Sequence, residues 1–465
     1  MERASGDVYI ERIVTGGLAQ VAYLVGDEDE AVSAIIDPCR DVDEYVELAR
    51  RLGTRIVAIL ETHVHADFVS GARELSERTD APIYSPRLGE QEFPHVALDD
   101  GDEVAVGRLR LRALWTPGHT PEHLAYLLSE SATSGPVALF SGDALFVGEV
   151  GRPDLLGAEN TERLTLQLYE TVCSRLATLP DGLTVYPGHG AGSSCGKSIG
   201  SAPFTTIGQE RRFSYAFQPR SAEEFVGVVL DRMPPPPTYY PILKQVNRRG
   251  PALVRDVSPG RPLTPTEVSR RSATGAVLID ARGPEAFGGS HIPGSVSIGL
   301  DGDFLAWSGW LAPHDRDVVL VLDRDQDFEG ARGRLRLIGV DHVVGYLQGG
   351  ITAWERAGYD VESLSSISVH ELGARLADGK PITVVDVRAD AEWDDGHIDG
   401  AVHHFAGDIV RGVGSLPAGR PLAVICAGGY RSCVAASVLE QRGERGVINV
   451  LGGMDAWRAA GYPVM

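Results

Sequence analysis

Short apolar runs, each bounded by charged or turn-forming residues, recur along the chain and predict buried strands. These runs lie at residues 55–60, 109–114, 137–141 and 421–425. Two longer runs, residues 164–179 and 433–442, are compatible with helices. Strands and helices of these lengths together predict an α/β protein.

Side chains that can bind a metal follow the predicted strands of the first half. The motif His-x-His-x-Asp comes directly after residues 55–60, and a Pro/Gly-flanked His, a Gly-Asp pair and a further Gly-His pair follow later strands. The residues concerned are His63, His65, Asp67, His119, Asp143 and His189. Open α/β sheets hold ligands at the carboxyl ends of their strands. Four such groups in this order therefore predict a metal site.

This series of motifs resembles that of the metallo-β-lactamase-like hydrolases over roughly residues 7–245. The resemblance implies an αββα sandwich. In that family another His usually follows the Asp of the first motif, whereas Phe68 stands at this place here. Because a phenyl ring cannot ligate a metal, a centre with two zinc ions is disfavoured. The alternative is a hydrolase that still binds two metals and in which only the residue at position 68 has changed.

The remaining donors fit a single metal. His63, His119 and Asp143 offer two imidazoles and one carboxylate, a set that with open positions is typical of non-heme Fe(II) oxygen chemistry. The chain resembles the persulfide dioxygenases, whose iron is held by residues matching these three, and the resemblance implies one Fe(II) per chain. The other motif residues would orient the ligands and bound water. They are His65, Asp67 and His189.

A second reactive segment follows the strand predicted at residues 421–425. Cys426 begins a Gly-rich loop that leads into a helix, and backbone N–H groups in such a loop lower the pKa of a thiol. Arg431 closes the loop and offers two donors to an anionic sulfur substrate. The segment resembles the active loop of a rhodanese. Its other members are Ala427, Gly428, Gly429, Tyr430 and Ser432.

The rhodanese resemblance extends to an internal repeat. The pattern Asp-x-Arg followed by His-Ile occurs from Asp280 and again from Asp386 at a constant offset, which indicates two rhodanese-like units with parallel sheets at roughly 255–360 and 363–465. Alignment of the apolar run 318–322 with the run 421–425 sets Asp323 against Cys426 and Phe328 against Arg431. A carboxylate cannot carry sulfane sulfur, so the first unit is predicted to be inactive, and its Asp-x-Arg and His-Ile residues to stabilise the fold.

These resemblances divide the chain into three predicted domains. A metallo-β-lactamase-fold domain spans residues 1–250, an inactive rhodanese-like domain 251–361 and an active rhodanese domain 362–465. About three domains also agree with the length of 465 residues.

Three further residues are candidates for substrate binding or sulfur relay. Cys195 lies in a Gly/Ser segment after His189, where the resemblance implies nearness to the iron, and either handles sulfur or is a buried bystander. Lys197 can favour the Cys195 thiolate. Arg152 either meets a carboxylate of a low-molecular-weight thiol or is a solvated surface residue.

Composition excludes several classes of function. The net charge of −21 argues against nucleic acid as a partner. Nothing approaches a membrane-spanning length, and residues 1–13 lack the apolar core of a signal peptide. Five cysteines without regular spacing argue against a disulfide framework. We therefore expect a cytoplasmic enzyme, and a homo-oligomer only from the resemblance.

Together the resemblances imply that O2 oxidises a low-molecular-weight thiol persulfide to sulfite and thiol, coupled to sulfur transfer through Cys426 with sulfite or thiosulfate as partner. Such a reaction removes sulfide. The thiol and the direction of sulfur flow stay open. One alternative is a glyoxalase II-like zinc thioester hydrolase fused to a sulfurtransferase. The other is a carrier with a degenerate metal site.

Overall fold

The computed structural model describes residues 2–5, 8–219, 221–412, 414–417 and 419–465, so that parts of the first and third predicted domains and of the N-terminal segment lie outside it. The chain forms two compact units. One comprises residues 1–256 with 336–339, and the other comprises 257–335 with 340–465. The exact limits of the three domains stay a prediction.

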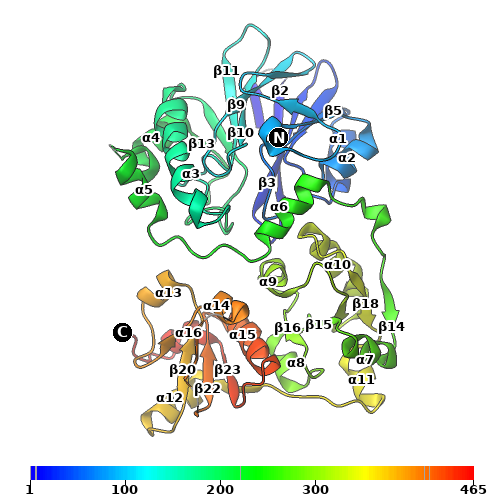
Figure 1. The fold of residues 1–465 in the computed structure, drawn as a ribbon, viewed down its shortest axis with the longest axis vertical. Helices are drawn as coiled ribbons and strands as arrows, with labels where there is room; N and C mark the ends of the chain where they lie inside the picture. The colour runs from blue at the N-terminus through cyan, green and yellow to red at the C-terminus, as the bar shows by residue number, and fades with distance from the viewer. Residues whose placement is uncertain (1, 6–7, 220, 413, 418) are drawn as a thin grey trace. The chain divides into compact units, whose positions relative to one another are not determined.

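The first unit contains two sheets that pack face to face (Figure 1). The first sheet follows chain order and consists of β1 (Glu2–Ser5), β2 (Val8–Thr15), β3 (Gln20–Asp27), β4 (Val32–Ile36), β5 (Arg55–Leu60), β6 (Ile83–Pro86) and β7 (Val96–Leu98). The second has the order β13-β12-β11-β10-β9-β8 and consists of β8 (Glu103–Val106), β9 (Leu109–Trp115), β10 (Leu124–Ser129), β11 (Pro136–Gly142), β12 (Thr184–Pro187) and β13 (Thr205–Thr206).

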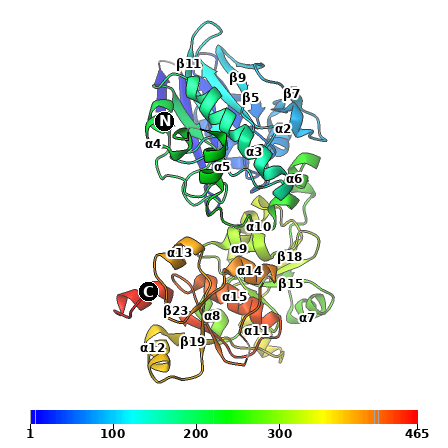
Figure 2. The same cartoon turned by 60° about the vertical axis from the view of Figure 1, so that its left-hand side comes forward.

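Helices cover the outer face of each sheet, as the turned view in Figure 2 also shows. They are α1 (Asp43–Arg51), α2 (Ala72–Thr79), α3 (Ala158–Glu170), α4 (Ile207–Phe213), α5 (Ala222–Leu230) and α6 (Tyr240–Arg249). One apolar cluster lies between the sheets, a second joins α1 and α2 to the first sheet, and a third joins α3 and α5 to the second sheet. These layers are the αββα sandwich that the sequence predicts.

The predicted strands of this unit end where the candidate ligands begin. β5 ends at Leu60, β9 at Trp115 and β11 at Gly142, each within a few residues of a motif. The helix predicted at residues 164–179 is α3, which continues through a π-helical segment at Thr171–Arg175 and a 3-10 turn at Leu176–Thr178.

The second unit contains two five-stranded parallel sheets with the same strand order. The first, in the order β14-β18-β17-β15-β16, consists of β14 (Arg261–Leu263), β15 (Val277–Asp280), β16 (Val296–Ser297), β17 (Val318–Val321) and β18 (Val343–Leu347). The second, in the order β19-β23-β22-β20-β21, consists of β19 (Ser365–Ser368), β20 (Thr383–Asp386), β21 (Val402–His403), β22 (Leu422–Ile425) and β23 (Val447–Leu451). The shared order confirms the repeat.

Five helices accompany each of these sheets. They are α7 (Pro265–Ala273), α8 (Pro284–Gly289), α9 (Phe304–Leu311), α10 (Phe328–Leu337) and α11 (Gly350–Arg356), then α12 (Val369–Ala377), α13 (Asp390–Asp394), α14 (Ala406–Arg411), α15 (Tyr430–Gln441) and α16 (Gly453–Ala459). Over the described residues, no helix combines the length and the hydropathy that crossing a lipid bilayer requires.

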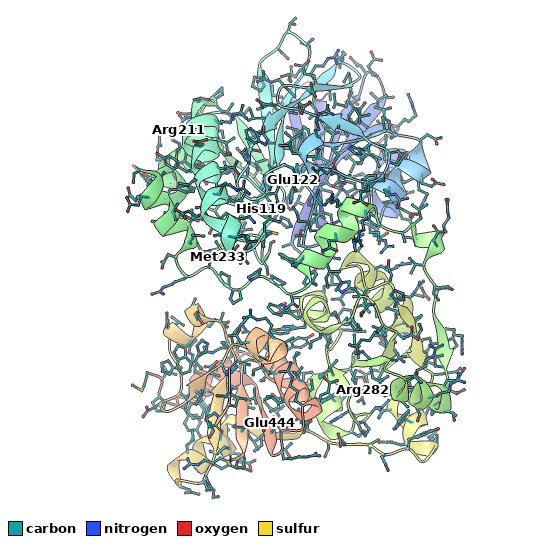
Figure 3. All side chains as sticks on the ribbon, in the orientation of Figure 1. His119, Glu122, Arg211, Met233, Arg282 and Glu444 are labelled. Atoms are coloured by element: carbon teal, nitrogen blue, oxygen red, sulfur yellow. The ribbon has the colours of Figure 1, made fainter. Side chains whose placement is uncertain are left out.

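The Asp-x-Arg pairs stabilise the two repeats from within, as the sequence predicts. Arg388 donates from Nε and Nη2 to the buried Asp386 carboxylate at 2.9 and 2.6 Å, and also to the carbonyl oxygen of Gly396. Arg282, labelled in Figure 3, forms the same bidentate pair with Asp280. Because both partners are buried, removal of one leaves an uncompensated charge.

We therefore expect Asp386→Ala to lower the free energy of unfolding of the second repeat by about 3–5 kcal/mol. Asp395→Ala is the matched control, because Asp395 pairs with Arg458 at the exposed surface, where such a pair contributes roughly 0–1 kcal/mol. Urea-induced unfolding of the full chain measures both. Equal effects of the two substitutions would contradict a structural role for the buried pair.

Candidate functional site

Three of the predicted ligands converge in the first unit. His119 Nε2 lies 3.5 Å and His63 Nε2 lies 4.0 Å from Oδ2 of Asp143. All three side chains are buried. His119, labelled in Figure 3, lies between β9 and β10 along the chain. The structure thus brings together two imidazoles and one carboxylate from three different strand ends.

The other ring nitrogen of each histidine is occupied. Nδ1 of His63 lies 2.9 Å from Oγ1 of Thr62, and Nδ1 of His119 lies 2.9 Å from the carbonyl oxygen of Arg152. Each Nε2 is thereby directed at Asp143, as is usual for ligating histidines. His63 Nε2 and Asp143 Oδ2 are buried without a hydrogen-bond partner among the described residues. Such converging orphaned atoms fit a bound metal ion.

His65 does not belong to this group of three. Its Nε2 lies 3.1 Å from Oδ1 of Asp37 and 3.2 Å from Oε2 of Glu61, both of them buried. Although burial lowers the pKa of His65, the two carboxylates outweigh it and raise the pKa well above its usual value. The second His of the motif thus has its Nε2 occupied by protein carboxylates, whereas its Nδ1 is buried without a hydrogen-bond partner among the described residues, as is Nε2 of His63.

His189 joins Asp143 to Asp67. Its Nδ1 lies 2.8 Å from Oδ1 of Asp143, and its Nε2 lies 2.7 Å from Oδ2 of Asp67. Burial lowers the pKa of His189, but the two carboxylates raise it overall to about 10. The interaction occupies one oxygen of Asp143 and leaves the other facing His63 and His119. His189 thus lies where it can orient Asp143, the role that the sequence predicts for it.

Phe68 and its neighbours are held rigidly. The Phe68 ring is buried and lies with its centroid 4.3 Å from that of His65. Asn247 on α6 donates to the carbonyl oxygens of His65 and Phe68 at 2.8 and 2.7 Å and accepts from the amide of Ser70. The loop that carries the first motif is thereby fixed from a distant helix.

His123, which follows the His119 turn, positions Asp143. The backbone N–H of Asp143 donates to Nε2 of His123 at 3.0 Å. Gly142 has a φ of 50°, and an added Cβ there would lie 2.6 Å from the same nitrogen. Only glycine therefore allows the close approach that this contact needs.

The buried pair of Glu122 and Lys244 was not found from the sequence. Glu122 Oε1 accepts from Nζ of Lys244 at 2.9 Å and from the amide of Val64 at 3.3 Å, so the His119 turn is tied to the His63 loop. Glu122 is labelled beside His119 in Figure 3. A Glu three residues after a Gly-His turn gives no local signal of this contact.

Cys195 lies beside Asp67 and His189. Its Sγ, one oxygen of Asp67 and one nitrogen of His189 lie within 4.8 Å of one another, and all three side chains are buried. Burial first, and then the charges of Asp67 and Asp143, raise the pKa of the Cys195 thiol well above its usual value. A role in sulfur handling stays a prediction.

Lys197 does not offset this effect. Its Nζ donates to the carbonyl oxygens of Val228 and Asp231, at 2.7 and 3.1 Å, near the end of α5. The expectation that Lys197 favours the Cys195 thiolate is therefore wrong, because its charge is used elsewhere.

Arg152 is fully buried, which rules out the solvated surface residue of the sequence alternatives. Its guanidinium pairs with Asp154 at 2.7 and 2.8 Å and donates to the carbonyl oxygens of Ser194 and Pro234. Its backbone N–H donates to the carbonyl oxygen of Cys195. With its donors committed to the protein, Arg152 fixes the Cys195 segment, and contact with a substrate carboxylate stays an untested prediction.

The predicted sulfur-transfer loop lies in the second unit. Cys426 follows β22, is buried, and its Sγ accepts from the backbone N–H of Gly429 at 3.1 Å. Gly429 has a φ of 99°, which favours glycine. The Cys426 thiol lies 3.4 Å from Oγ of Ser432, which donates to Oδ1 of Asn449 at 2.6 Å. Helix α15 begins at Tyr430, earlier than residue 433 as predicted.

Arg431 makes an ion pair that the sequence did not reveal. Its Nη1 and Nη2 donate to the two oxygens of Glu392 on α13, at 2.6 and 2.7 Å. These are the donors that we expected an anionic substrate to use. The hydrogen bonds to Glu392 raise the pKa of Arg431 further.

The first repeat needs a correction. In the sheet registers Asp280 pairs with Val321, whereas Asp386 pairs with Ile425. Leu322, not Asp323, therefore stands at the position of Cys426. The sequence alignment was one residue out, because β17 and β18 in this repeat match β22 and β23 at one constant offset, with no insertion between them. Helix α10 nevertheless begins two residues later after its strand than α15 does. A buried leucine cannot carry sulfur either, so the predicted inactivity has a different residue as its cause.

Comparisons with known proteins agree with this architecture. The sequence profile of the Metallo-beta-lactamase superfamily matches residues 15–189, and that of the Rhodanese-like domain matches residues 264–357 and 368–460. The mitochondrial persulfide dioxygenase ETHE1 of Bos taurus is 30% identical over 44% of this chain and 74% of its own length. The chain belongs to the metallo-β-lactamase superfamily. Its second unit consists of two rhodanese-like domains.

Two further relatives carry names of other activities within the same superfamily. A crystal structure titled metallo-beta-lactamase, from Staphylococcus aureus subsp. aureus COL, superposes with a TM-score of 0.68 at 33% identity and covers 73% of this chain and 99% of its own. A cytoplasmic hydroxyacylglutathione hydrolase of Arabidopsis thaliana is 31% identical over 36% of this chain and 62% of its own length. The fusion to rhodanese-like domains is thus supported, while the specific chemistry is not decided.

We expect His119→Ala to lower the affinity of the chain for metal by at least about tenfold, because it removes one of three converging donors. His370→Ala, an exposed histidine of the second rhodanese-like domain, serves as the matched control. Metal per chain after dialysis, measured by elemental analysis, tests this expectation. Equal metal content in the two variants would show that the three residues do not form the site.

Proposed function

We propose that the first unit is a persulfide dioxygenase that binds one Fe(II) through His63, His119 and Asp143. The observation that carries this proposal is the convergence of two imidazoles and one carboxylate, with His63 Nε2 and Asp143 Oδ2 buried without a hydrogen-bond partner among the described residues. That set with open positions is typical of non-heme Fe(II) oxygenases. Relatives named persulfide dioxygenase support the same activity.

The reaction would convert a low-molecular-weight persulfide, O2 and water into the thiol and sulfite. When bound, the iron would supply neighbouring open positions for both reactants and activate O2. The protein residues fix the two imidazoles through Thr62 and Arg152 and keep the centre buried. His189, between two carboxylates, holds a proton next to Asp143.

We further propose that Cys426 carries sulfane sulfur as a persulfide in a sulfurtransferase reaction. The amide of Gly429 stabilises a charge on its sulfur, and the position at the start of a twelve-residue helix adds to this effect. Sulfite would accept the sulfur to form thiosulfate, or thiosulfate would supply it. The five cysteines form no disulfide among the described residues, which fits a reducing, cytoplasmic location.

A glyoxalase II-like zinc hydrolase is the second candidate, because hydroxyacylglutathione hydrolases also match the first unit. In that activity two metals and a water molecule would cleave a thioester. Phe68, which stands where the resemblance places a further ligand, argues against it.

Oxygen uptake by the anaerobically iron-loaded protein, with a low-molecular-weight persulfide as substrate, tests the dioxygenase. We expect uptake that requires about one iron per chain and falls below detection in His119→Ala. Uptake that persists without iron would contradict the Fe(II) dioxygenase, and two zinc ions per chain together with thioester cleavage would instead establish the hydrolase.

Cys426→Ser separates the two proposed activities. We expect this variant to lose sulfur transfer completely and to keep its oxygen uptake, since the thiol lies in a different compact unit from the metal ligands. Cyanide-dependent release of thiocyanate measures the transfer, and Cys433→Ser is the control on the neighbouring helix position. Retained transfer in Cys426→Ser would refute the assignment of the nucleophile.

A further inference from the structure

Glu392 occupies the donors of Arg431 at the mouth of the Cys426 loop. The pair is bidentate, with N–O distances of 2.6 and 2.7 Å. The side chains of Arg431 and Glu392 are 21% and 37% exposed, so the pair is open to an incoming substrate. One carboxylate already accepts both hydrogen bonds that the Arg431 guanidinium offers on this side. An anionic sulfur substrate therefore gains less binding energy from Arg431 than it would from an unpaired arginine.

The first rhodanese-like domain adds further negative charge to this rim. Tyr430 donates from its hydroxyl to the carbonyl oxygen of Gly299 at 2.9 Å, which holds the segment 299–303 against the start of α15. After burial, the charge of Asp303 is the main cause that raises the pKa of Tyr430, and Asp301 adds to it. Asp303 also contributes, after Glu392, to the raised pKa of Arg431.

Arg334 and Arg388 are further cations near these carboxylates. Arg334 lies 4.7 Å above the ring of Phe304 and donates to the carbonyl oxygen of Leu300 at 2.9 Å. After Arg431, Arg388 also lowers the pKa of Glu392 against the effect of burial, but it is itself paired with the buried Asp386. These groups amount to four carboxylates, those of Glu392, Asp301, Asp303 and Asp386, against three guanidinium groups. An arriving dianion meets a net negative charge.

We infer that Glu392 makes Cys426 selective for sulfur donors of low negative charge, such as an organic persulfide, over the dianion thiosulfate. This inference rests on the proposed sulfur transfer through Cys426. The thiolate attacks the outer sulfur of R–S–SH, and a new S–S bond forms to Sγ as the old S–S bond breaks. The electron pair leaves with R–S⁻, and the proton stays on the transferred sulfur. The carboxylates act as a repulsive element against the wrong donor.

Two donors that differ mainly in charge test the inference. Thiosulfate is a dianion and leaves as sulfite, whereas methanethiosulfonate is a monoanion and leaves as methanesulfinate. Anaerobic loading of the full-length protein with each donor is followed by mass spectrometry of the Cys426 peptide. We expect Glu392→Gln to raise the kcat/KM ratio of thiosulfate to methanethiosulfonate by about tenfold, the effect of removing one nearby unit charge at a partly exposed site.

Asp390→Asn is the matched control. It removes the same charge from the same helix, but its side chain is 82% exposed and faces His403 rather than Arg431. We expect this variant to leave the ratio unchanged and Asp303→Asn to raise it in the same direction as Glu392→Gln.

Two results would overturn the inference while sulfur transfer itself stands. One is an equal fall of kcat/KM for both sulfur donors in Glu392→Gln, which would mean that Glu392 only positions Arg431. The other is an equal rise of the ratio in Asp390→Asn. Failure of both donors to load Cys426 in the unsubstituted protein would instead overturn the proposed sulfur transfer, and the inference with it.

Discussion

Asp37, a buried carboxylate directly after β4, organises the loop that carries the first histidines. Its Oδ1 accepts from the amide of Thr62 at 2.7 Å, and its Oδ2 accepts from the hydroxyl of the same residue at 2.8 Å. Thr62 in turn lies beside Nδ1 of His63, while Asp37 itself contacts His65. A single side chain thus fixes the orientation of both histidines of the motif. The hydrogen bonds from Thr62 and the contact with His65 offset the cost of burying the Asp37 carboxylate.

The two centres use carboxylates in a similar way. In the first unit, Asp37 and Glu61 contact Nε2 of His65, and in the second, Glu392 accepts from both Nη atoms of Arg431. In both cases a nitrogen of a motif residue is committed to a protein carboxylate. What the motif offers to a substrate is therefore decided by residues outside it, and motif matching alone overstates the number of available groups.

The sequence predicts those parts of the molecule that depend on local pattern. The strand at Arg55–Leu60 has the limits expected from its apolar run, and the three converging ligands follow from strands that end at a common edge. The repeat is equally visible, because identical folds require similar spacing of apolar and polar positions. All of these features arise from interactions between residues that are close in sequence or related by the repeat.

Long-range polar contacts could not be predicted. Arg152 binds the carbonyl oxygens of Ser194 and Pro234, and Arg431 binds Glu392, each across a stretch of chain that the fold alone brings together. A charged residue in a motif carries no sign of whether its partner is a substrate or another side chain. The register of the first repeat was one residue out for another reason, since an uninterrupted apolar run such as 318–322 fits its counterpart in more than one alignment.

Helix α15, which follows the Cys426 loop, rests partly on the first repeat. Ser297, from that repeat, accepts a hydrogen bond from Cys433 and donates its backbone N–H to Ser437, both on α15. All three side chains are buried, so a chain cut between the two repeats would leave polar groups on this helix without their partners.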